Sequence, residues 1–252
     1  MYNKVKTPDE ISAIRESGRM LATVHEKLKE FIKPGITTKE IDEYAIAETR
    51  KLGGIPAFLG YQGFPGGVCT SINDAVVHGI PGDIVLNEGD IISLDYGVTY
   101  GGMITDAART YVVGGTEAAS KQVQKLISDT QRSLDMGIAQ IKPGARIGDI
   151  SSAVQKVLDD GGYGIVRDLV GHGVGHQLHE SPEIPNYGHA GTGPVLKEGM
   201  TIAIEPMSTL GDWKVVVDPD GWTIRTRDGS LSSHSEDTIL VTADGAEILT
   251  RL

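Results

Sequence analysis

The feature that most constrains how this 252-residue chain can fold is a pattern of elements that occurs twice along the sequence. In each copy, a helix with apolar residues at spacings of three and four ends at the motif IKPG, and a second helix ends at Gly-Gly. The IKPG motifs occupy residues 32–35 and 141–144, an offset of 109 residues. Self-similarity at a fixed offset predicts two related halves.

Start and stop signals set the expected bounds of these helices. The first begins at the capping box TPDE (7–10) and stops at the first IKPG, and the second covers about residues 38–52. In the second copy we expect helices over 116–140 and 148–160.

A pair of strand-like segments repeats at nearly the same offset. LNEGDIISLD (86–95) aligns with LKEGMTIAIE (196–205), with four of ten positions identical. Coincidence of common helix-end chemistry explains a repeated IKPG, but it does not explain this match. We therefore expect two pseudo-symmetric α+β halves, with Asp95 and Glu205 facing each other across the pseudo-axis.

Composition fits a globular protein and argues against several partners. Apolar residues make up 39% and charged residues 23%, and the net charge of −11 disfavours nucleic-acid binding, which needs clustered Lys and Arg.

The single cysteine, Cys69, excludes an internal disulfide and fits a reducing compartment. The polar start MYNKVKT lacks the apolar run of a signal peptide, and no stretch of 18 apolar residues exists to span a membrane. We expect a cytoplasmic protein.

Two aspartates are expected to face each other in a hairpin over residues 91–113. The sequence alternates like a strand, breaks at YGG (100–102) and alternates again. If the first two residues of YGG form the turn, Asp95 and Asp106 lie directly opposite, with Cβ atoms about 5 Å apart. Buried like charges at that distance raise a pKa or require a cation between them.

Two further acids and a histidine-rich segment lie in apolar surroundings. Glu205 follows TIAI, and Glu236 precedes the strand-like run DTILVT. The segment GHGVGHQLHESP contains His172, His176 and His179, and it has no HExxH helix motif. Because buried carboxylates are seldom left unpaired, these groups indicate a metal site, an acid–base site or structural ion pairs.

Taken in order, these residues resemble a known family. The five metal ligands of methionine aminopeptidases are similar to Asp95, Asp106 eleven residues later, His172 in GHGVGH, Glu205 in IEPM and Glu236 in SEDT. That family's two active-site histidines resemble His78 in VVHGIP and His179 in LHESP. The resemblance extends from the first helix to the closing VTADGAEILT.

The resemblance implies the α+β "pita-bread" fold, in which two pseudo-symmetric halves, each a curved antiparallel sheet covered by helices, hold the metals between them. Residues 1–252 would form a single catalytic metallopeptidase domain with an internal repeat at about 10–110 and 116–240. The chain resembles the short bacterial type I enzymes. It lacks the Cys-rich extension of eukaryotic type I and the helical insert of type II between Glu205 and Glu236.

The resemblance also implies a role for each metal ligand. Asp106 and Glu236 would bridge two divalent ions, Asp95 would chelate one of them, and His172 and Glu205 would complete the other. Four carboxylates and an imidazole suit Co, Mn, Fe or Zn. A metal-bridged hydroxide would attack the carbonyl carbon of an N-terminal methionine, which releases the initiator methionine from nascent proteins with a small second residue.

Catalytic and pocket roles follow from the same resemblance. His179 would donate to the oxyanion, His78 would help at the leaving nitrogen, and Glu205 would shuttle the proton. The linear thioether of methionine suits apolar and aromatic walls. The side chains expected to line that pocket are Tyr61, Phe64, Trp222, Phe58, Leu178 and Cys69. The partners implied are peptides with N-terminal Met, nascent chains and a transient contact with the ribosome, for a monomer.

Three positions depart from the family pattern. Phe58 stands where bacterial relatives often have Cys, and Leu178 where they often have Phe, an exchange that could preserve the pocket volume. Asp237 replaces a histidine beside the expected bridging Glu and adds a negative charge there. Asn73 and Ser232 match positions whose backbone oxygens hold a monovalent cation in relatives.

Other functions fit the sequence less well. A covalent hydrolase needs an activated nucleophile, but the chain has no GxSxG motif, and a lone cysteine is more typical of a core residue. GHGVGH is neither GxGxxG nor a phosphate loop. Two alternatives stay open, a proline-specific peptidase of the same fold and a relative that lost its metals and serves as a binding module. The histidines that carry no motif, and for which we expect a structural role, are His25, His176, His189 and His234.

Overall fold

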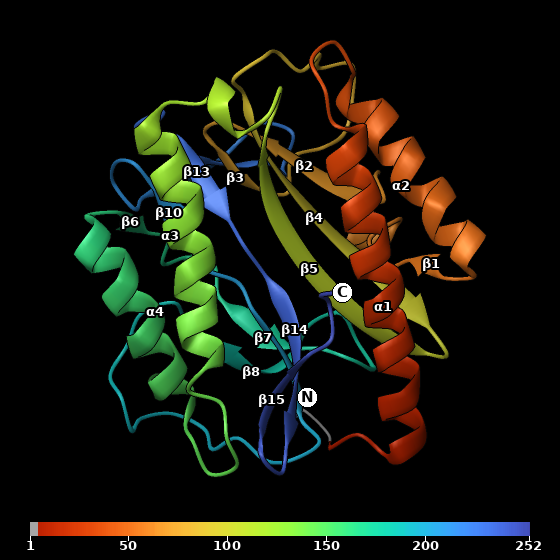
Figure 1. Cartoon of the computed structure of the whole chain (residues 1–252), viewed down its shortest axis with the longest axis vertical. Helices are drawn as coiled ribbons and strands as arrows, with labels where there is room; N and C mark the ends of the chain where they lie inside the picture. The colour runs from red at the N-terminus through yellow and green to blue at the C-terminus, as the bar shows by residue number, and fades with distance from the viewer. Residues whose placement is uncertain (1–4) are drawn as a thin grey trace.

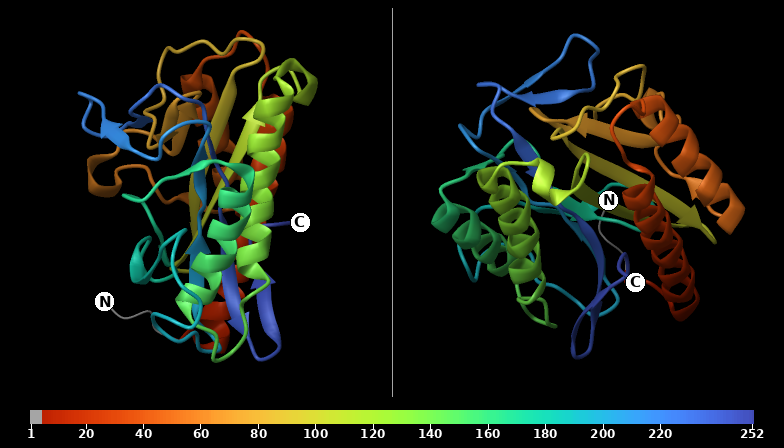
Figure 2. Two further views of the ribbon diagram at one scale, coloured as in Figure 1. Left: turned by 90° about the vertical axis from the view of Figure 1, so that its left-hand side faces the viewer. Right: turned by 45° about the horizontal axis from the view of Figure 1, so that its top comes forward.

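Two pairs of helices cover one face of a curved layer of strands in the computed structural model, which describes residues 5–252. Residues 1–4, part of the polar start expected to lack a signal peptide, lie outside the described part. One pair consists of α1 (Pro8–Phe31) and α2 (Thr38–Leu52), and the other of α3 (Lys121–Ile138) and α4 (Ile147–Gly161). The strands of the two halves meet between these pairs (Figure 1 and Figure 2).

The helix bounds follow the expected end signals, with one exception. The first helix begins at the capping box, where the Thr7 hydroxyl accepts from the Glu10 N–H and the Glu10 carboxylate accepts from the Thr7 N–H. The third helix begins later than expected, because residues 116–118 form a 3₁₀ turn and Ser120 then caps α3 by accepting from the Val123 N–H. Apolar periodicity does not separate a 3₁₀ turn from the first turn of an α-helix.

The first half contains an antiparallel sheet built around a long hairpin. Its central strand β4 (Ile91–Tyr100) pairs with β5 (Met103–Val112), β2 (Val68–Ile72) and β1 (Ile55–Pro56). A short strand β3 (Ala75–Val77) joins a separate sheet with β12 (Ile224–Thr226) and β11 (Val215–Val217).

The second half contains the other large antiparallel sheet. Its strands, in spatial order, are β15 (Gly245–Ile248), β14 (Asp237–Thr242), β9 (Thr201–Ile204), β7 (Gly171–Gly173) and β8 (Glu180–Ile184). A smaller sheet has the order β13 (Ser232–His234), β10 (Met207–Thr209) and β6 (Gly164–Ile165). No helix within residues 5–252 is both long enough and apolar enough to cross a membrane.

The two halves share a pattern of backbone hydrogen bonds around their IKPG motifs. The N–H of the motif's glycine donates to the Leu86 carbonyl in the first half and to the Leu196 carbonyl in the second. Each of these leucines donates in turn to the residue that follows the motif, Ile36 or Ala145. The same local chemistry therefore fixes the approach of helix and strand in both halves.

The register of the β4–β5 hairpin differs from the expected one. The turn is Gly101-Gly102 and not the expected Tyr100-Gly101, so Asp95 pairs with Ala108 and Asp106 pairs with Gly97. Both glycines have positive φ, the conformation that a tight hairpin turn requires and that disfavours tyrosine. A shift of one turn position moves pairing by two residues, so both aspartates stay on one face as diagonal neighbours.

Each half has its own apolar core beneath its helix pair. The first includes Leu21 and Leu28 of α1 with Leu94 and Tyr96 of β4. The second is centred on α3, α4, β9 and β14, and its fully buried members include Leu134, Ile150, Leu158, Ile202 and Ile239. The two sheets thus rest on separate cores, and they meet where the backbones of Ala108 in β5 and Glu236 before β14 exchange hydrogen bonds.

A glycine in α1 lets the first half pack against the end of the chain. A Cβ built on Gly18 would lie 2.2 Å from the carbonyl oxygen of Leu249, a buried residue of the second half. Backbone approaches that close exclude any side chain at position 18.

We expect Gly18→Ala to destabilise the protein by about 1–3 kcal/mol, because the added methyl group overpacks this contact. Ser12→Ala, at an exposed position of the same helix, is the control and should change stability by no more than about 0.5 kcal/mol. Urea unfolding of the three proteins measures both values. A Gly18→Ala variant more stable than the parent would contradict the close packing, because helix propensity alone favours alanine by about 1 kcal/mol.

Candidate metal centre

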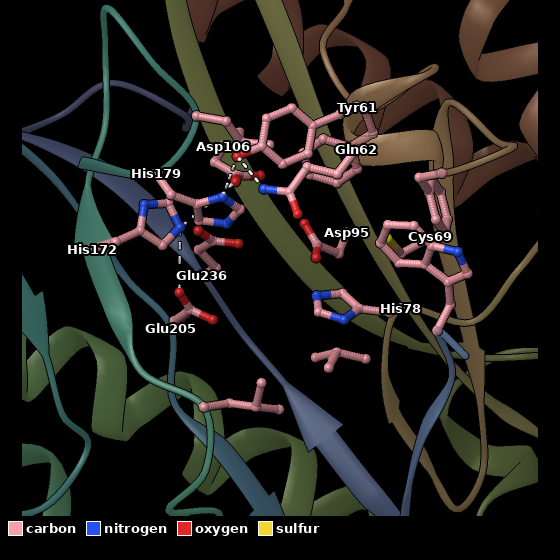
Figure 3. Close-up of a pocket in the computed structure, with 16 residues that line it drawn as sticks. Tyr61, Gln62, Cys69, His78, Asp95, Asp106, His172, His179, Glu205 and Glu236 are labelled. Atoms are coloured by element: carbon pink, nitrogen blue, oxygen red, sulfur yellow. Dashed lines mark hydrogen bonds and ion pairs between the residues drawn. The ribbon is translucent and has the colours of Figure 1, made fainter. Parts of the chain in front are cut away.

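The five residues expected to bind metal converge between the two sheets. Asp95 comes from β4, Asp106 from β5 and His172 from β7, whereas Glu205 directly follows β9 and Glu236 directly precedes β14. Figure 3 shows the five side chains pointing toward one another in one cavity. Both halves therefore contribute to a single site.

The donor atoms of this cluster have the spacing of ligands to shared ions. One atom each from Asp106, His172 and Glu236 lie within 4.8 Å of one another. The Nε2 atom of His172 is 3.5 Å from Oε1 of Glu205 and 3.9 Å from Oδ2 of Asp106. Since metal–ligand bonds in proteins are about 2.0–2.3 Å long, donors of one ion are separated by such distances.

The tautomer of His172 suits a metal ligand. Its Nδ1 lies 3.0 Å from the Gly173 carbonyl and donates to it, which leaves the lone pair of Nε2 directed at the carboxylates. Ligating histidines usually donate their other N–H in this way. Burial lowers the pKa of His172 to about 3, so the ring is neutral.

The carboxylates are buried without a protein cation to balance them within the cluster. Burial raises the pKa of Asp106 to about 7, and burial together with the neighbouring acids raises the pKa values of Asp95, Glu205 and Glu236 well above their ordinary range. Among residues 5–252, Asp95 Oδ1, Asp106 Oδ1 and Glu236 Oε1 have no hydrogen-bond partner. Divalent cations would satisfy these oxygens and compensate the charge, so this donor set fits them.

A chain of hydrogen bonds orients His179 at the edge of the cluster. The Gln62 amide donates to the Tyr61 hydroxyl oxygen (3.2 Å), and that hydroxyl lies 2.9 Å from Nδ1 of His179. The phenol is thus free to donate to Nδ1, which assigns the remaining proton of a neutral ring to Nε2. The His179 and His172 rings meet edge to face at 4.4 Å.

The second expected active-site histidine lies on a constrained backbone. His78 has φ +58°, a conformation uncommon for residues other than glycine. The next residue, Gly79, accepts from the Thr70 N–H and donates to the Ser71 hydroxyl, so β2 holds the turn in place. Burial, with a contribution from His179, lowers the pKa of His78 to about 4.

An apolar pocket adjoins the acidic cluster. It contains every side chain expected there, namely Phe58, Tyr61, Phe64, Cys69, Leu178 and Trp222. Phe64 and Trp222 meet edge to face, with ring centroids 5.2 Å apart. Phe58 and Leu178, the two departures from the family pattern, belong to the same buried cluster.

Sequence reasoning missed three residues of this wall, Gln62, Val77 and Leu169. Val77 directly precedes His78, and Gln62 directly follows Tyr61, so their positions next to predicted site residues were the available signal. Leu169 lies three residues before His172 and carries no motif of its own.

The charge of Asp237, the third departure, is compensated. Its carboxylate accepts from Arg109 (2.6 Å), Arg251 (2.8 Å) and the Thr250 hydroxyl (2.7 Å). Arg109 also donates to the backbone carbonyl of Glu236. The added negative charge is therefore held by two guanidinium groups, which also anchor the backbone beside Glu236.

The histidines without a motif lie in different surroundings. His176 is partly exposed and pairs with Glu10 at 2.7 Å, and His189 is exposed. His25 is buried, with Nε2 3.0 Å from the Ala107 carbonyl. His234 is buried inside the molecule, with Nε2 3.9 Å from Oε2 of Glu205.

Asn73 and Ser232, the expected cation-binding positions, are adjacent. The Ser232 N–H donates to the Asn73 carbonyl (2.9 Å), and the Ser232 hydroxyl donates to the Ala75 carbonyl (3.0 Å).

Comparisons with known proteins agree with this geometry. Residues 12–243 match the model of metallopeptidase family M24. Methionine aminopeptidase 1 of Bacillus subtilis (strain 168) is 48% identical over 98% of both chains, and methionine aminopeptidase of Clostridium perfringens is 44% identical over 98% of both.

Solved structures give the same result. The crystal structure of methionine aminopeptidase from Thermotoga maritima matches with a TM-score of 0.96 at 46% identity, over 99% of each chain. Prolidase from Pyrococcus furiosus, at 24% identity and a TM-score of 0.75, covers 99% of this chain and 66% of its own length, and it shows the fold alone. These matches confirm the expected pita-bread fold.

We expect the metal-free protein to lose stability as pH rises from 7.5 to 9. The folded state holds protons on carboxyls of raised pKa, Asp106 at about 7 among them, whereas the unfolded chain has released these protons. The free energy of unfolding should fall by about 1 kcal/mol or more. Above pH 7.5 histidines in the unfolded chain, with ordinary pKa values near 6.5, are about 90% neutral or more. The buried histidines, whose pKa values are lowered by folding, therefore contribute little to this slope.

Chemical unfolding of chelator-stripped protein at several pH values measures this slope. Asp106→Asn should reduce it, and saturating Mn²⁺ should abolish it because the ions replace the protons. A stability that rises over this window would show that the carboxyls are not held as described.

Proposed function

The chain belongs to metallopeptidase family M24, and we propose that it is a methionyl aminopeptidase that removes the N-terminal initiator methionine from nascent proteins and prefers a small second residue. The observation that carries the proposal is a hard-donor cluster of four carboxylates and one imidazole beside an apolar pocket. A dinuclear centre and a methionine side chain fit these two features. Family membership and the donor cluster support the use of divalent metal.

The ligand roles that we propose follow the places of the side chains in the cluster. Asp106 and Glu236 lie centrally and would hold both of two ions, Asp95 would hold one, and His172 with Glu205 would hold the other. Oxygen donors and one imidazole suit Mn, Fe, Co or Zn. Bound there, the ions lower the pKa of a coordinated water and polarise the scissile carbonyl.

The chain's own residues would guide the proton and the developing charge. The Nε2–H of His179, oriented by Tyr61 through Nδ1, would donate to the carbonyl oxygen as it becomes an oxyanion. Glu205 would take the proton of the attacking water and pass it on to the nitrogen as the C–N bond breaks. His78, on the constrained turn, would contact the substrate amide at that nitrogen.

Selectivity for methionine would come from the apolar pocket. An unbranched thioether makes favourable contacts with aromatic rings, and Phe58, Phe64 and Trp222 supply three. A charged side chain gains less there, because the buried walls have few polar partners to offer.

We also infer that residues 1–252 work as one catalytic domain with related halves at about 10–110 and 116–240. The shared hydrogen bonds around the two IKPG motifs support this inference. Each half supplies part of the cluster, so neither half alone could hold both ions.

The direct test is metal-dependent peptide trimming. Chelator-stripped protein given Mn²⁺ or Co²⁺ should remove Met from Met-Ala-Ser and leave Leu-Ala-Ser intact, as followed by mass spectrometry. Glu236→Gln should be inactive on both peptides, because it loses a bridging charge. Trimming of X-Pro peptides instead would favour the proline-specific alternative, and metal-loaded protein that trims nothing would defeat the proposal.

We predict that His179→Ala lowers kcat by roughly 10²–10³-fold, the cost of removing one oxyanion donor. Tyr61→Phe, which keeps the imidazole and removes only its hydrogen-bond partner, is the matched comparison and should have a smaller effect. Steady-state kinetics on Met-Ala-Ser measures both. An effect of His179→Ala confined to KM would rule out the oxyanion role.

A further inference from the structure

His234 is a buried imidazole whose ring has no hydrogen-bond partner. It is 1% exposed, and neither Nδ1 nor Nε2 is hydrogen bonded within residues 5–252. Its backbone, by contrast, is fixed on both sides by Thr110, whose hydroxyl accepts from the His234 N–H (3.0 Å) and donates to the His234 carbonyl (2.8 Å). Buried polar groups are normally paired, so a ring held this firmly calls for a partner.

The sheet register gives His234 the position in the second half that Asp106 has in the first. In β4–β5, Asp106 pairs with Gly97, two residues after Asp95. In β10–β13, His234 pairs with Met207, two residues after Glu205. His234 and Asp106 therefore occupy equivalent positions in the two halves, because each pairs with the residue two positions after an acid of the cluster.

This equivalence continues along both ladders. Val113 donates to the Asp90 carbonyl, and Val241 donates to the Met200 carbonyl, five residues before Asp95 and Glu205 respectively. The register thus directs the side chain at position 234 toward the cluster, as it directs the carboxylate of Asp106.

The Glu205 carboxylate lies beside the His234 ring. Oε2 of Glu205 is 3.9 Å from Nε2 of His234, and Oε1 is 3.5 Å from Nε2 of His172. The backbone carbonyl of Glu205 accepts from the Asn186 amide (3.0 Å). The backbone of Glu205 is therefore fixed. Its carboxylate lies between the imidazole rings of His172, the expected metal ligand, and His234.

We propose that His234 is a positioning residue, which donates a hydrogen bond from Nε2–H to Oε2 of Glu205 and thereby directs Oε1 toward the His172 side of the metal centre. Formation of this bond needs an approach of about 1 Å, which a small rotation of the Glu205 side chain provides. The inference rests on the proposed function only in taking Glu205 as a metal ligand.

Such a bond acts on the metal through its ligand. A carboxylate held by a donor at one oxygen presents the other in a single orientation, which lowers the entropy lost when an ion binds. Loss of an outer hydrogen-bond partner typically costs 10–100-fold in metal affinity or activity.

The test compares His234→Leu, which removes both ring nitrogens, with His234→Gln, which keeps an N–H donor on a side chain of similar reach. Calorimetric titration of metal-free protein with Mn²⁺ should show affinity weakened by about 10-fold or more in His234→Leu. His234→Gln should stay within about 3-fold of the parent. His176→Gln removes a histidine near the same cluster that pairs with Glu10, and it should bind Mn²⁺ as the parent does.

A second measurement separates positioning from a purely structural role. Thermal unfolding of metal-free His234→Leu should give a Tm close to the parent's, because the loss of one hydrogen bond is offset by the removal of a polar ring from the core. A lower Tm with unchanged Mn²⁺ affinity would mean that His234 only stabilises the core.

The proposal is overturned if His234→Leu matches the parent in Mn²⁺ affinity, or if His234→Gln is as weak as His234→Leu. Peptide trimming distinguishes a failure of the positioning role of His234 from a failure of the proposed aminopeptidase function. A parent that binds Mn²⁺ more tightly than His234→Leu but trims no Met peptide would refute the proposed function and leave the positioning role intact.

Discussion

Mutual repulsion among buried carboxylates is the constraint on which the rest of this structure depends. Asp95, Asp106, Glu205 and Glu236 point into one cavity, where burial raises the pKa of each. No fold would retain such a cluster for stability alone, because each uncompensated charge costs free energy. Divalent cations reverse that cost, so the same residues that strain the metal-free protein become the source of its chemistry.

The rigidity needed to hold this cluster comes from outside it. Separate apolar cores fix the two sheets. Hydrogen bonds that involve backbone carbonyls then orient the residues that would bind metal. The carbonyl of Gly173 sets the His172 ring, and Arg109 with Asp237 anchors the chain beside Glu236. The pocket then needs only apolar walls, since the charged end of the substrate would meet the metals.

Much of this could be predicted from the sequence, because helix ends, strand alternation and motif spacing are local signals. Helix α2 was found in this way, whereas the pocket residues Phe64 and Trp222 were expected from the family resemblance. The hairpin turn was misplaced by one residue, because YGG allows two turns and only the positive φ of both glycines decides between them. Compensation of Asp237 by Arg251 was beyond prediction, because the two residues pair through tertiary packing. His234 was set aside as structural, because its equivalence to Asp106 follows from the strand register and not from the offset of the sequence repeat.

The most direct test of the account is to locate the ions. Crystals of the chelator-stripped protein soaked in Mn²⁺ should give two anomalous peaks, with Asp106 and Glu236 in contact with both, Asp95 with one, and His172 and Glu205 with the other. Peaks at these places would establish that the buried acids form one dinuclear centre. A cavity that takes up no ion, or ions held by other side chains, would contradict the central claim.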